Sequence, residues 1–340
     1  MFDLFKNYLT NRRQYVCLNG YKSAIGEVNN GVPQGSNIGP LLFLVYINDL
    51  ENLPLKGVPR LFADDTALFY PSNNPQTVID HMNSDLQKLK SYFSNNLLSL
   101  NIKKTKYMIF RSSRKILPEH LDPKLDGDSI EKVDSFKYLG IFLDSKFSWE
   151  VQISHIERKI SSLCGILSRV QGFVPRHVSM KFYYAHIHSL LQYIITVWGR
   201  ACKSRLMRLQ VLQNRCLKII FRLPHLYPTF DLYANLSHNI LPLLGLCELQ
   251  TLHMVHKIRH NSRTHSNIVL NTIPQTRTTR QAGNLALIRA ASNQGQRRFS
   301  YVGPLKYNAL PNDLKLIINS NLFKFKIKKY LKGKINDFLL

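Results

Sequence analysis

Acidic residues are scarce in this sequence of 340 residues, above all in its second half. The chain holds 21 Asp and Glu against 46 Lys and Arg, a formal net charge of +25. Residues 161–340 contain only 4 of the acidic residues but 26 of the basic ones. Such a positive field favours a polyanionic partner, and nucleic acid is the most common one.

Cysteines and long apolar runs are also few. The five Cys residues are odd in number and scattered, and they form no Cys-x-x-Cys pair, which argues against a disulfide framework or a zinc ribbon. The longest apolar runs, such as residues 41–47, are far shorter than the roughly 18 residues of a membrane span. The first residues lack the pattern of a secretory signal. We therefore expect an intracellular protein, nuclear or cytoplasmic or both, with no membrane partner.

Hydrophobic residues make up 44% of the chain, so a sizeable core is expected. Residues 1–160 alternate strand-like and helix-like patterns, and the remainder is mostly helical, which predicts an α+β fold followed by an α unit. The strands are expected over 14–18, 60–69, 106–110 and 136–143. The helices are expected over 40–50, 75–97, 153–170, 180–198, 206–221 and 314–340, the last with a break at Gly333. A polar loop is expected over 112–131 and a linker over 261–284.

Two adjacent carboxylates, Asp64 and Asp65, are the sharpest feature of the sequence. They lie between the apolar runs 61–63 and 67–69, a pattern that predicts a hairpin with buried strands and an acidic tip. Like charges repel, and divalent cations relieve the repulsion. One or two carboxylates commonly hold Mg²⁺ together with substrate phosphates, and two such ions about 4 Å apart stabilise phosphoryl transfer. Taken alone, however, such a pair is also typical of a solvated surface turn.

A glycine-rich loop precedes this hairpin. It reads Gly31-Val32-Pro33-Gln34-Gly35-Ser36 and leads into the helix expected over 40–50, with Ser36 or Asn37 as the cap. Leu41, Leu44, Val45 and Asn48 would share one face of that helix. Glycines let backbone approach a ligand closely, and a helix N-terminus favours phosphate. A simple strand-to-helix turn is the alternative for the loop alone, but the order of loop, helix and acidic hairpin is far more specific.

In this combination the sequence resembles the reverse transcriptase domain of non-LTR retrotransposons of the jockey-like or LINE kind. The resemblance rests on GVPQGSNIGPLLFLVYINDL (31–50) followed by LFADDTALF (61–69). These strings favour this family over maturase or telomerase relatives. Weaker similarity extends it to essentially the whole chain, over residues 100–106, 138–144, 193–199, 213–218 and 322–326.

The resemblance implies an RNA-directed DNA polymerase that transfers a nucleotide from a dNTP to a primer 3′-hydroxyl. Asp64 and Asp65 would be the catalytic carboxylates that bind Mg²⁺, with Mn²⁺ as an alternative. Ala63 would keep the space beside them small. Lys104 would protonate or neutralise the leaving pyrophosphate. In such chemistry, positioning and charge neutralisation dominate.

The resemblance also implies how the substrates would bind. The partners would be an RNA template, a DNA primer and a dNTP. Pro33, Gln34 and Gly35 would line the site for the incoming dNTP and the template. Tyr138, Leu139 and Gly140 would form the primer grip that positions the primer 3′ end.

By the same resemblance, residues 1–148 would form a partial reverse transcriptase palm, an antiparallel sheet with helices. Residues 149–225 would form a helical thumb, and 226–340 a basic, mostly helical C-terminal region. The first catalytic aspartate of the family normally lies well upstream of the GVPQG loop. Asp3 does not match it, because residues 4–14 resemble the helix and turn that follow that motif. We therefore expect a fragment with little or no activity of its own, or alternatively a non-catalytic relic that binds RNA through its basic C-terminal half.

Other features of the second half allow two interpretations each. His253, His256 and His260 have the spacing of partly exposed histidines on one helix face, which we favour over a zinc site. Tyr193 and Trp198 are expected to pack in the core or thumb and not to stack on bases. Lysines alternate with apolar residues over 324–332, which predicts either an RNA-binding segment or a solvated basic helix with an apolar seam.

Overall fold

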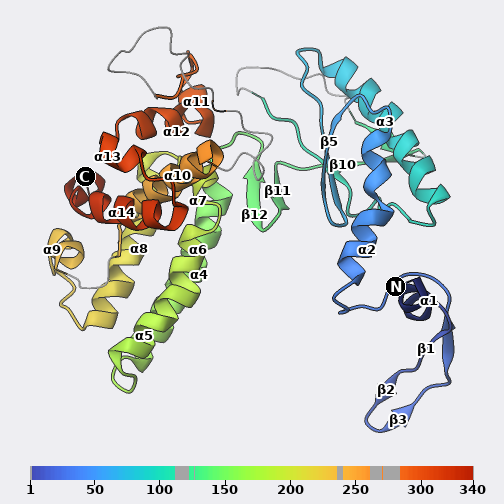
Figure 1. The fold of residues 1–340 in the computed structure, drawn as a ribbon, viewed down its shortest axis with the longest axis horizontal. Coiled ribbons are helices and arrows are strands. Elements are labelled where there is room, and N and C mark those ends of the chain that lie inside the picture. The colour runs from blue at the N-terminus through green and yellow to red at the C-terminus, as the bar shows by residue number, and fades with distance from the viewer. Residues whose placement is uncertain are drawn as a thin grey trace. The chain divides into compact units, whose positions relative to one another are not determined.

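The computed structural model describes residues 2–111, 122–125, 127–235, 240–260, 270 and 284–339. The chain forms two compact units (Figure 1). The first comprises Met1–Tyr107 and Ser113–Val133, and the second comprises Met108–Ser112 and Asp134–Leu340. The second unit thus takes a short insert from within the sequence of the first, and Phe110 of this insert stacks on Phe147 with ring centroids 4.4 Å apart. The expected linker over 261–284 lies outside the described residues, apart from 270 and 284.

The first unit mixes helices with two-stranded ladders. Strands β1–β4, β2–β3, β5–β6 and β8–β9 pair antiparallel, and β7–β10 pair parallel. Its helices are α1 (Phe2–Leu9), α2 (Gly39–Tyr46), the 3₁₀ helix η1 (Asn48–Asn52) and α3 (Pro75–Asn95). Its strands are β1 (Arg12–Gln14), β2 (Cys17–Leu18), β3 (Tyr21–Lys22), β4 (Gly26–Val28), β5 (Val58–Phe62), β6 (Asp65–Phe69), β7 (Lys106–Tyr107), β8 (Lys124–Leu125), β9 (Asp128–Ser129) and β10 (Glu131–Lys132).

Helix α3 confirms the prediction from its periodicity. Asn74 accepts a hydrogen bond from the Gln76 amide at 3.0 Å and caps the helix, and Pro75 occupies the first turn, where its missing N–H costs nothing. The buried apolar side chains follow the expected spacing of three and four residues and include Ile79, Leu86 and Leu89. The helix nevertheless ends at Asn95, before Leu97, which is exposed and has a left-handed φ of 50°.

Helix α2 is shorter than expected. Ser36 accepts a hydrogen bond from the Gly39 amide at 3.1 Å, but the N-cap of the helix is Ile38, which makes no side-chain cap bond, so the predicted cap at Ser36 or Asn37 is wrong. The α-helical part ends at Tyr46, and the chain tightens into η1. Leu41, Leu44 and Val45, which were expected to share one face of this helix, are exposed on this unit.

Three further expectations for strands and loops are wrong in detail. The described part of the loop expected over 112–131 contains the short strands β8, β9 and β10. The strand expected over 14–18 is interrupted between β1 and β2. The strand expected over 136–143 is a hairpin, because Leu139 and Gly140 both take left-handed φ values, 46° and 82°, that reverse the chain.

The second unit places one hairpin against a set of helices. Its strands are β11 (Ser135–Tyr138) and β12 (Ile141–Asp144). Its helices are α4 (Glu150–Val170), α5 (Arg176–Phe182), the π-helical turn η2 (Tyr183–His188), α6 (Ser189–Gln192), α7 (Ile195–Trp198), α8 (Lys203–Phe221), α9 (Thr229–Ala234), α10 (Leu243–His260), α11 (Asn293–Gln296), α12 (Phe299–Asn308), α13 (Asn312–Lys315), α14 (Ser320–Lys332) and the 3₁₀ helix η4 (Ile335–Phe338). As expected, the terminal pair breaks at Gly333, which caps α14.

Two hydrophobic clusters form the core of this unit. The first lies between α4, α8 and the segment from α5 to α7, and it contains the fully buried Ile153, Ile160 and Leu209. The second gathers on α10, α12 and α14 around Leu252, Phe323 and Ile327. No described helix combines the length and hydropathy that crossing a membrane requires. The second unit resumes at Asp134, so the hairpin β11–β12 belongs with the helices that follow it and not with the first unit.

The single helix expected over 180–198 is broken. After α6 the backbone turns extended at Tyr193 and left-handed at Ile194, with a φ of 49°, before α7 begins. The indole N–H of Trp198 donates to the Tyr193 carbonyl at 2.8 Å and satisfies it where the helical ladder stops. Trp198 is fully buried in the core, as predicted.

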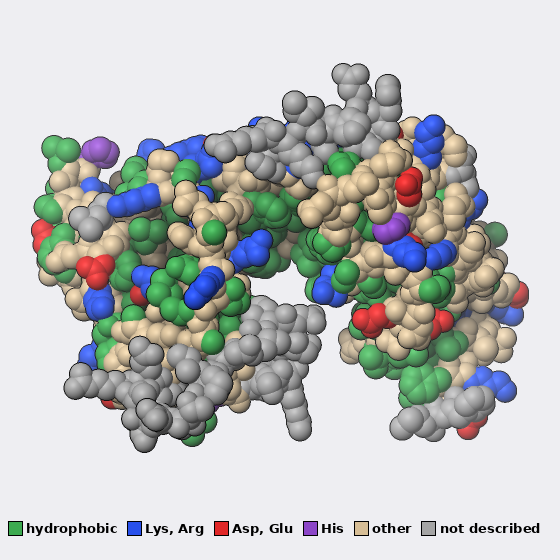
Figure 2. All heavy atoms as spheres, turned by 90° about the horizontal axis from the view of Figure 1, so that it is seen from above, with side chains coloured by type: hydrophobic (Ala, Val, Ile, Leu, Met, Phe, Trp, Pro, Cys, Tyr) green, Lys and Arg blue, Asp and Glu red, His purple; other side chains and the backbone are tan. Residues whose placement is uncertain are grey.

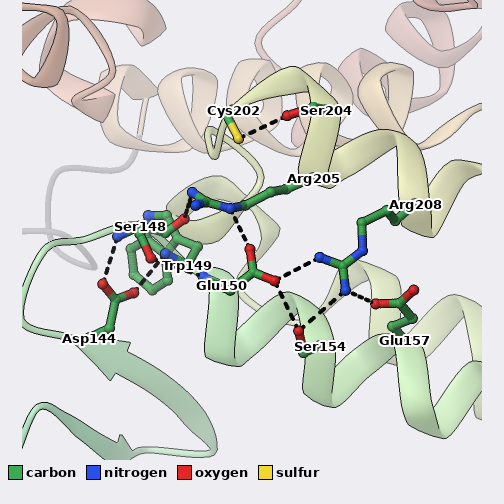
Figure 3. Close-up of polar contacts among 10 residues, drawn as sticks. All are labelled: Asp144, Ser148, Trp149, Glu150, Ser154, Glu157, Cys202, Ser204, Arg205 and Arg208. Atoms are coloured by element: carbon green, nitrogen blue, oxygen red, sulfur yellow. Dashed lines mark hydrogen bonds and ion pairs between the residues drawn. The ribbon is translucent and has the colours of Figure 1, made fainter.

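A buried carboxylate joins the hairpin β11–β12 to helix α4. Asp144 accepts hydrogen bonds from the backbone amides of Ser148 and Trp149, at 2.8 and 2.7 Å (Figure 3). It also accepts one from the Lys146 amide at 3.2 Å. Beyond it, Gln152 accepts the Phe142 amide at 2.9 Å. The last residue of the hairpin therefore fixes the entry of the chain into α4.

Replacing Asp144 should test this junction. We expect Asp144→Asn to lower the free energy of unfolding by about 2–4 kcal/mol, because the neutral amide leaves buried N–H groups without a charged acceptor. Urea denaturation followed by circular dichroism measures the change. Asp134→Asn, on an exposed side chain of the same hairpin segment, should change stability by less than about 0.5 kcal/mol. Equal effects of the two substitutions would contradict the role of Asp144.

Candidate functional site

The hairpin β5–β6 carries the two adjacent carboxylates at its turn. Phe62 pairs with Asp65, so Ala63 and Asp64 form a two-residue connection. Ala63 takes a left-handed φ of 50°, a conformation that two-residue hairpin turns require and that glycine usually supplies. The predicted hairpin with an acidic tip is confirmed.

The strands of this hairpin are not buried, contrary to the expectation from their apolar residues. Phe62 is 61% exposed and Phe69 46%, and both carboxylates are exposed as well. The physical reason is that β5 and β6 pair only with each other among the described strands. A lone two-stranded ladder cannot cover its own apolar side chains.

Asp85 anchors the base of the same hairpin and was not predicted. This fully buried residue of α3 accepts the Lys56 amide at 2.9 Å, the Gly57 amide at 2.8 Å and the Tyr70 hydroxyl at 3.2 Å. Burial, followed by the charge of Asp85, raises the pKa of Tyr70 well above its ordinary value, so the hydroxyl stays protonated as a donor. The sequence signal was a charged residue next to Leu86 within the apolar stripe of α3.

The glycine-rich loop is held from several sides. Gly31 and Gly35 have φ values of 76° and 79°, which only glycine adopts without strain. The Arg12 guanidinium donates to the Gly31 carbonyl at 2.7 Å, and the Ser36 hydroxyl donates to the Pro33 carbonyl at 2.8 Å. Gln34 and Gly35 are left exposed at the loop, directly before α2.

Lys104 lies in an exposed turn after α3. Its backbone amide donates to the Asn101 side chain at 3.0 Å, and its own side chain is exposed. Within the described part of the chain, no ion pair or hydrogen bond joins Lys104, or the loop residues 33–35, to Asp64 or Asp65. The structure thus brings Ala63, Asp64 and Asp65 together in one turn and leaves the loop residues 33–35 and Lys104 in separate segments of the first unit.

The carboxylate pair offers only part of a metal site. Carboxylate oxygens are the ligands that Mg²⁺ prefers, and two of these groups stand side by side at the hairpin turn. Among the residues that the structure describes, however, no group of three or more His, Cys, Asp or Glu side chains lies close enough to hold a metal ion. The described residues therefore do not complete a coordination sphere around an ion at Asp64 and Asp65.

The second unit presents the other predicted segment, the turn of hairpin β11–β12. Tyr138 and Leu139 are half-buried and Gly140 is exposed. The Tyr193 hydroxyl donates to the Leu139 carbonyl at 2.7 Å. Tyr193 is 50% exposed, so of the two positions expected for it the core is wrong, and packing in the thumb stays a prediction.

A network of charged side chains binds α4 to α8 next to this hairpin (Figure 3). The Arg208 guanidinium donates to Glu150 at 2.7 Å and also pairs with Glu157. Glu150 pairs with Arg205 as well, and Arg205 donates to the Ser148 carbonyl at 2.9 Å. The hydrogen bond from Arg208 is the main reason that the pKa of Glu150 lies below its usual value. These ion pairs therefore join α4 and α8, the two helices that would form a thumb, near the hairpin β11–β12.

The three histidines of α10 have structural partners. His253 and His256 are buried, so the expected partly exposed face is wrong for these two. His253 forms a hydrogen bond of 3.0 Å with the Ser320 hydroxyl, and His256 Nε2 donates to the Ile317 carbonyl at 2.7 Å. His256 also stacks on Phe323. These contacts join α10 to α14, and no metal-binding group of three ligands occurs among the described residues.

Comparison with known proteins bears on the first unit most directly. The family described as reverse transcriptase (RNA-dependent DNA polymerase) matches residues 2–143. Relatives match a larger part of the chain. An RNA-directed DNA polymerase from mobile element jockey of Drosophila melanogaster is 27% identical over 300 residues, 83% of this chain and 32% of the relative. A probable RNA-directed DNA polymerase from transposon BS of the same organism is 29% identical over 248 residues, 69% of this chain and 27% of the relative.

A more distant relative is the Pol polyprotein of the type-1 retrotransposable element R1 of Bradysia coprophila. It is 25% identical over 264 residues, which cover 74% of this chain and 24% of the relative. The chain therefore spans about a third or less of the length of these relatives. No solved structure matches the chain.

Two histidines, the half-buried His188 and the buried His253, are expected to make the fold less stable in acid. Burial lowers the pKa of both His188 and His253 to about 4, below the ordinary value of 6.5. Between these pH values the histidines are protonated in the unfolded chain but stay neutral in the folded chain. The free energy of unfolding therefore falls as the pH drops from 6.5 towards 4. We expect each histidine to cost about 1–2 kcal/mol between pH 7 and pH 5.

Urea titrations at pH 7, 6 and 5 measure this dependence. His253→Asn should flatten the slope, because it removes one of the titrating groups. His177→Asn changes an exposed histidine of α5 and should leave the slope as it is. Identical slopes in wild type and His253→Asn would show that His253 does not titrate with folding.

Proposed function

Because the N-terminal part of this chain is a reverse transcriptase domain, related to the RNA-directed DNA polymerases of non-LTR retrotransposons, we propose that it supplies part of a polymerase active site. The reaction is nucleotidyl transfer from a dNTP to a primer 3′-hydroxyl, directed by an RNA template. One observation carries the proposal: within the residues that match the family, Asp64 and Asp65 stand at the turn of a hairpin anchored by Asp85.

The exposed carboxylates suit this chemistry. A turn that points two negative charges into solvent is open to a metal ion and to a dNTP triphosphate, which a buried pair is not. The glycine-rich loop is fixed by hydrogen bonds but leaves Gln34 and Gly35 exposed. This supports a role for these residues in contacting the incoming dNTP and the template. Lys104, whose side chain is free of ion pairs with described residues, is a candidate for neutralising the leaving pyrophosphate.

In the second unit, we assign the primer grip to Tyr138, Leu139 and Gly140. Their turn has an exposed glycine that lets a nucleic-acid backbone approach closely. Helices α4 and α8, which follow the hairpin and are joined by ion pairs, would form the thumb within residues 149–225. Residues 1–148 would form the partial palm and 226–340 the C-terminal region.

The ion would be Mg²⁺, with Mn²⁺ as an alternative, and Asp64 and Asp65 would each supply a carboxylate. When bound, such an ion neutralises the charge of the triphosphate. Since no described third side chain joins the pair, the chain alone should hold the ion weakly and polymerise little or not at all.

Metal binding tests the assignment of the two carboxylates. We expect Mn²⁺, followed by its electron paramagnetic resonance signal, to bind the chain weakly, and Asp64→Asn and Asp65→Asn each to weaken binding about tenfold. Asp80→Asn is the matched control, because Asp80 is an exposed carboxylate on α3. Equal Mn²⁺ binding by Asp64→Asn, Asp65→Asn and wild type would refute the proposed site.

The same variants serve in a primer-extension assay with an RNA template, an annealed DNA primer and dNTPs. We expect the purified chain to extend the primer no more than Asp64→Asn does. Extension by wild type that Asp64→Asn abolishes would support the polymerase assignment and would show that two carboxylates suffice.

A second function, RNA binding without catalysis, is favoured by the charge of residues 161–340, where 26 basic residues face 4 acidic ones. Figure 2 shows Lys and Arg side chains spread over the exposed surface. Helix α14 packs the seam Phe323, Ile327 and Leu331 into the core, so its lysines lie on the remaining faces. Burial and then the charges of Lys324 and Lys332 lower the pKa of Lys328, a sign that like charges gather there.

RNA binding should depend steeply on salt. We expect the double variant Lys324→Gln, Lys328→Gln to bind single-stranded RNA several-fold more weakly and to reduce the slope of log affinity against log salt by about 1. Lys306→Gln is the control, because Lys306 is already paired with Glu248 at 2.9 Å. Fluorescence anisotropy from 50 to 300 mM KCl measures both, and an unchanged slope in the double variant would exclude α14 from the RNA-binding surface. Asp64→Asn should leave this binding unchanged.

A further inference from the structure

The contact between Tyr193 and the turn of β11–β12 joins two segments far apart in the sequence. The Tyr193 hydroxyl donates to the Leu139 carbonyl at 2.7 Å. Its ring lies over the next residue so closely that a Cβ added to Gly140 would meet the ring and the hydroxyl at 3.2 Å. One tyrosine thus bonds the first residue of the turn and contacts one side of the second, which stays exposed.

The break in the helix places Tyr193 in this position. The Tyr193 amide still donates to the Ser189 carbonyl at 3.0 Å, as at the end of a helix. The backbone then leaves the helix at Ile194, and Trp198 holds the Tyr193 carbonyl at 2.8 Å. Trp198 is completely buried, so the kink is fixed from inside the core. This accounts for the Tyr and Trp of segment 193–199, which the proposed active site does not use.

The turn needs such a restraint. Leu139 has a left-handed φ of 46°, which a leucine adopts only where its surroundings impose it. The hairpin has two strands, and Phe136 and Lys137 on β11 are exposed. A two-stranded hairpin alone is marginally stable. Asp144 secures its far end, and Tyr193 is the contact that secures the turn itself.

Tyr193 is dispensable for the core. It is 50% exposed, whereas its neighbours Leu191, Ile195 and Trp198 are buried. Removing its hydroxyl should therefore leave the fold intact and act on the turn alone.

From these contacts we propose that Tyr193 is a positioning residue: it clamps the turn Leu139-Gly140 in the conformation that receives a primer 3′ end. This inference rests on the proposed function, because it takes the turn as the primer grip. Tyr193 itself acts through the Leu139 carbonyl, and no contact of its own with the reacting atoms is required.

Tyr193→Phe tests the clamp, because it deletes only the hydroxyl and keeps the ring. Hydrogen–deuterium exchange of the full chain, read in peptides covering 135–144, should be about 5- to 10-fold faster in this variant. The matched control is Tyr227→Phe, on a half-buried tyrosine whose hydroxyl has no hydrogen bond to a described residue. It should leave exchange in this hairpin unchanged. Unchanged exchange in Tyr193→Phe would overturn the clamp.

A binding experiment tests what the clamp is for, without requiring catalysis. Two labelled RNA–DNA duplexes of equal length are compared by fluorescence anisotropy, one with a recessed DNA 3′ end and one blunt. Wild type should prefer the recessed end several-fold, and Tyr193→Phe should lose that preference while binding the blunt duplex equally well. A preference that survives in Tyr193→Phe would overturn the positioning role.

The two measurements separate this inference from the proposed function. If wild type shows no preference for a recessed 3′ end, the turn is not a primer grip, and the positioning role falls with it. Faster exchange in Tyr193→Phe would then still establish the clamp as a purely structural contact. Faster exchange together with the lost preference supports both.

Discussion

A buried aspartate that accepts backbone N–H groups is the interaction on which both units depend. Asp85 does this in the first unit and Asp144 in the second. In each case the carboxylate joins a helix to one end of a two-stranded hairpin. Charge-assisted bonds to backbone amides are stronger and more directional than apolar contacts, so they fix where each hairpin leaves its helix. The turns Ala63-Asp64 and Leu139-Gly140 lie at the other ends of these hairpins, so their positions depend in part on the hydrogen bonds of Asp85 and Asp144.

The few acidic side chains of the second unit are used in a similar way, to join parts of the fold. The second unit has few acidic side chains, and the structure uses several of them for internal pairing. Glu150 and Glu157 hold Arg205 and Arg208 between α4 and α8, and Glu248 pairs with Lys306. Lys324 and Lys328 of α14 take part in none of these ion pairs, and the charge of Lys324 instead lowers the pKa of Lys328. A polyanion would relieve this repulsion, which is the physical basis for expecting nucleic acid on this unit.

The parts of the fold that the sequence predicted are those set by local rules. The cap and apolar stripe of α3, the acidic hairpin and the break at Gly333 all follow from spacing and residue type within one segment. Residue patterns failed where distant segments decide the outcome. The kink at Ile194 depends on the bond from Trp198, and a helical periodicity over 180–198 contains no sign of it.

The site was predictable to a similar degree. The acidic hairpin could be predicted because the two carboxylates and the apolar strands on either side of them all lie within the nine residues 61–69. The exposure of that hairpin was not predictable, because burial of an apolar strand depends on which strands or helices cover it, and β5 and β6 pair only with each other among the described strands. The contacts of Asp85 and Tyr193 were missed because each joins residues at least 15 positions apart in the sequence. A charge inside an apolar stripe was the one available sign for Asp85, and Tyr193 had none.

The insert 108–112 has a consequence for the order in which the chain matures. Since Phe110 stacks on Phe147, a part of the second unit is synthesised before the first unit is complete. During synthesis on the ribosome, Phe110 therefore emerges before Phe147, the residue it stacks on, which lies 37 residues later in the sequence. Neither unit can be separated from the other by a single cut in the chain. A protease that nicks between residues 112 and 122 would divide the first unit but leave Phe110 covalently joined to the wrong half.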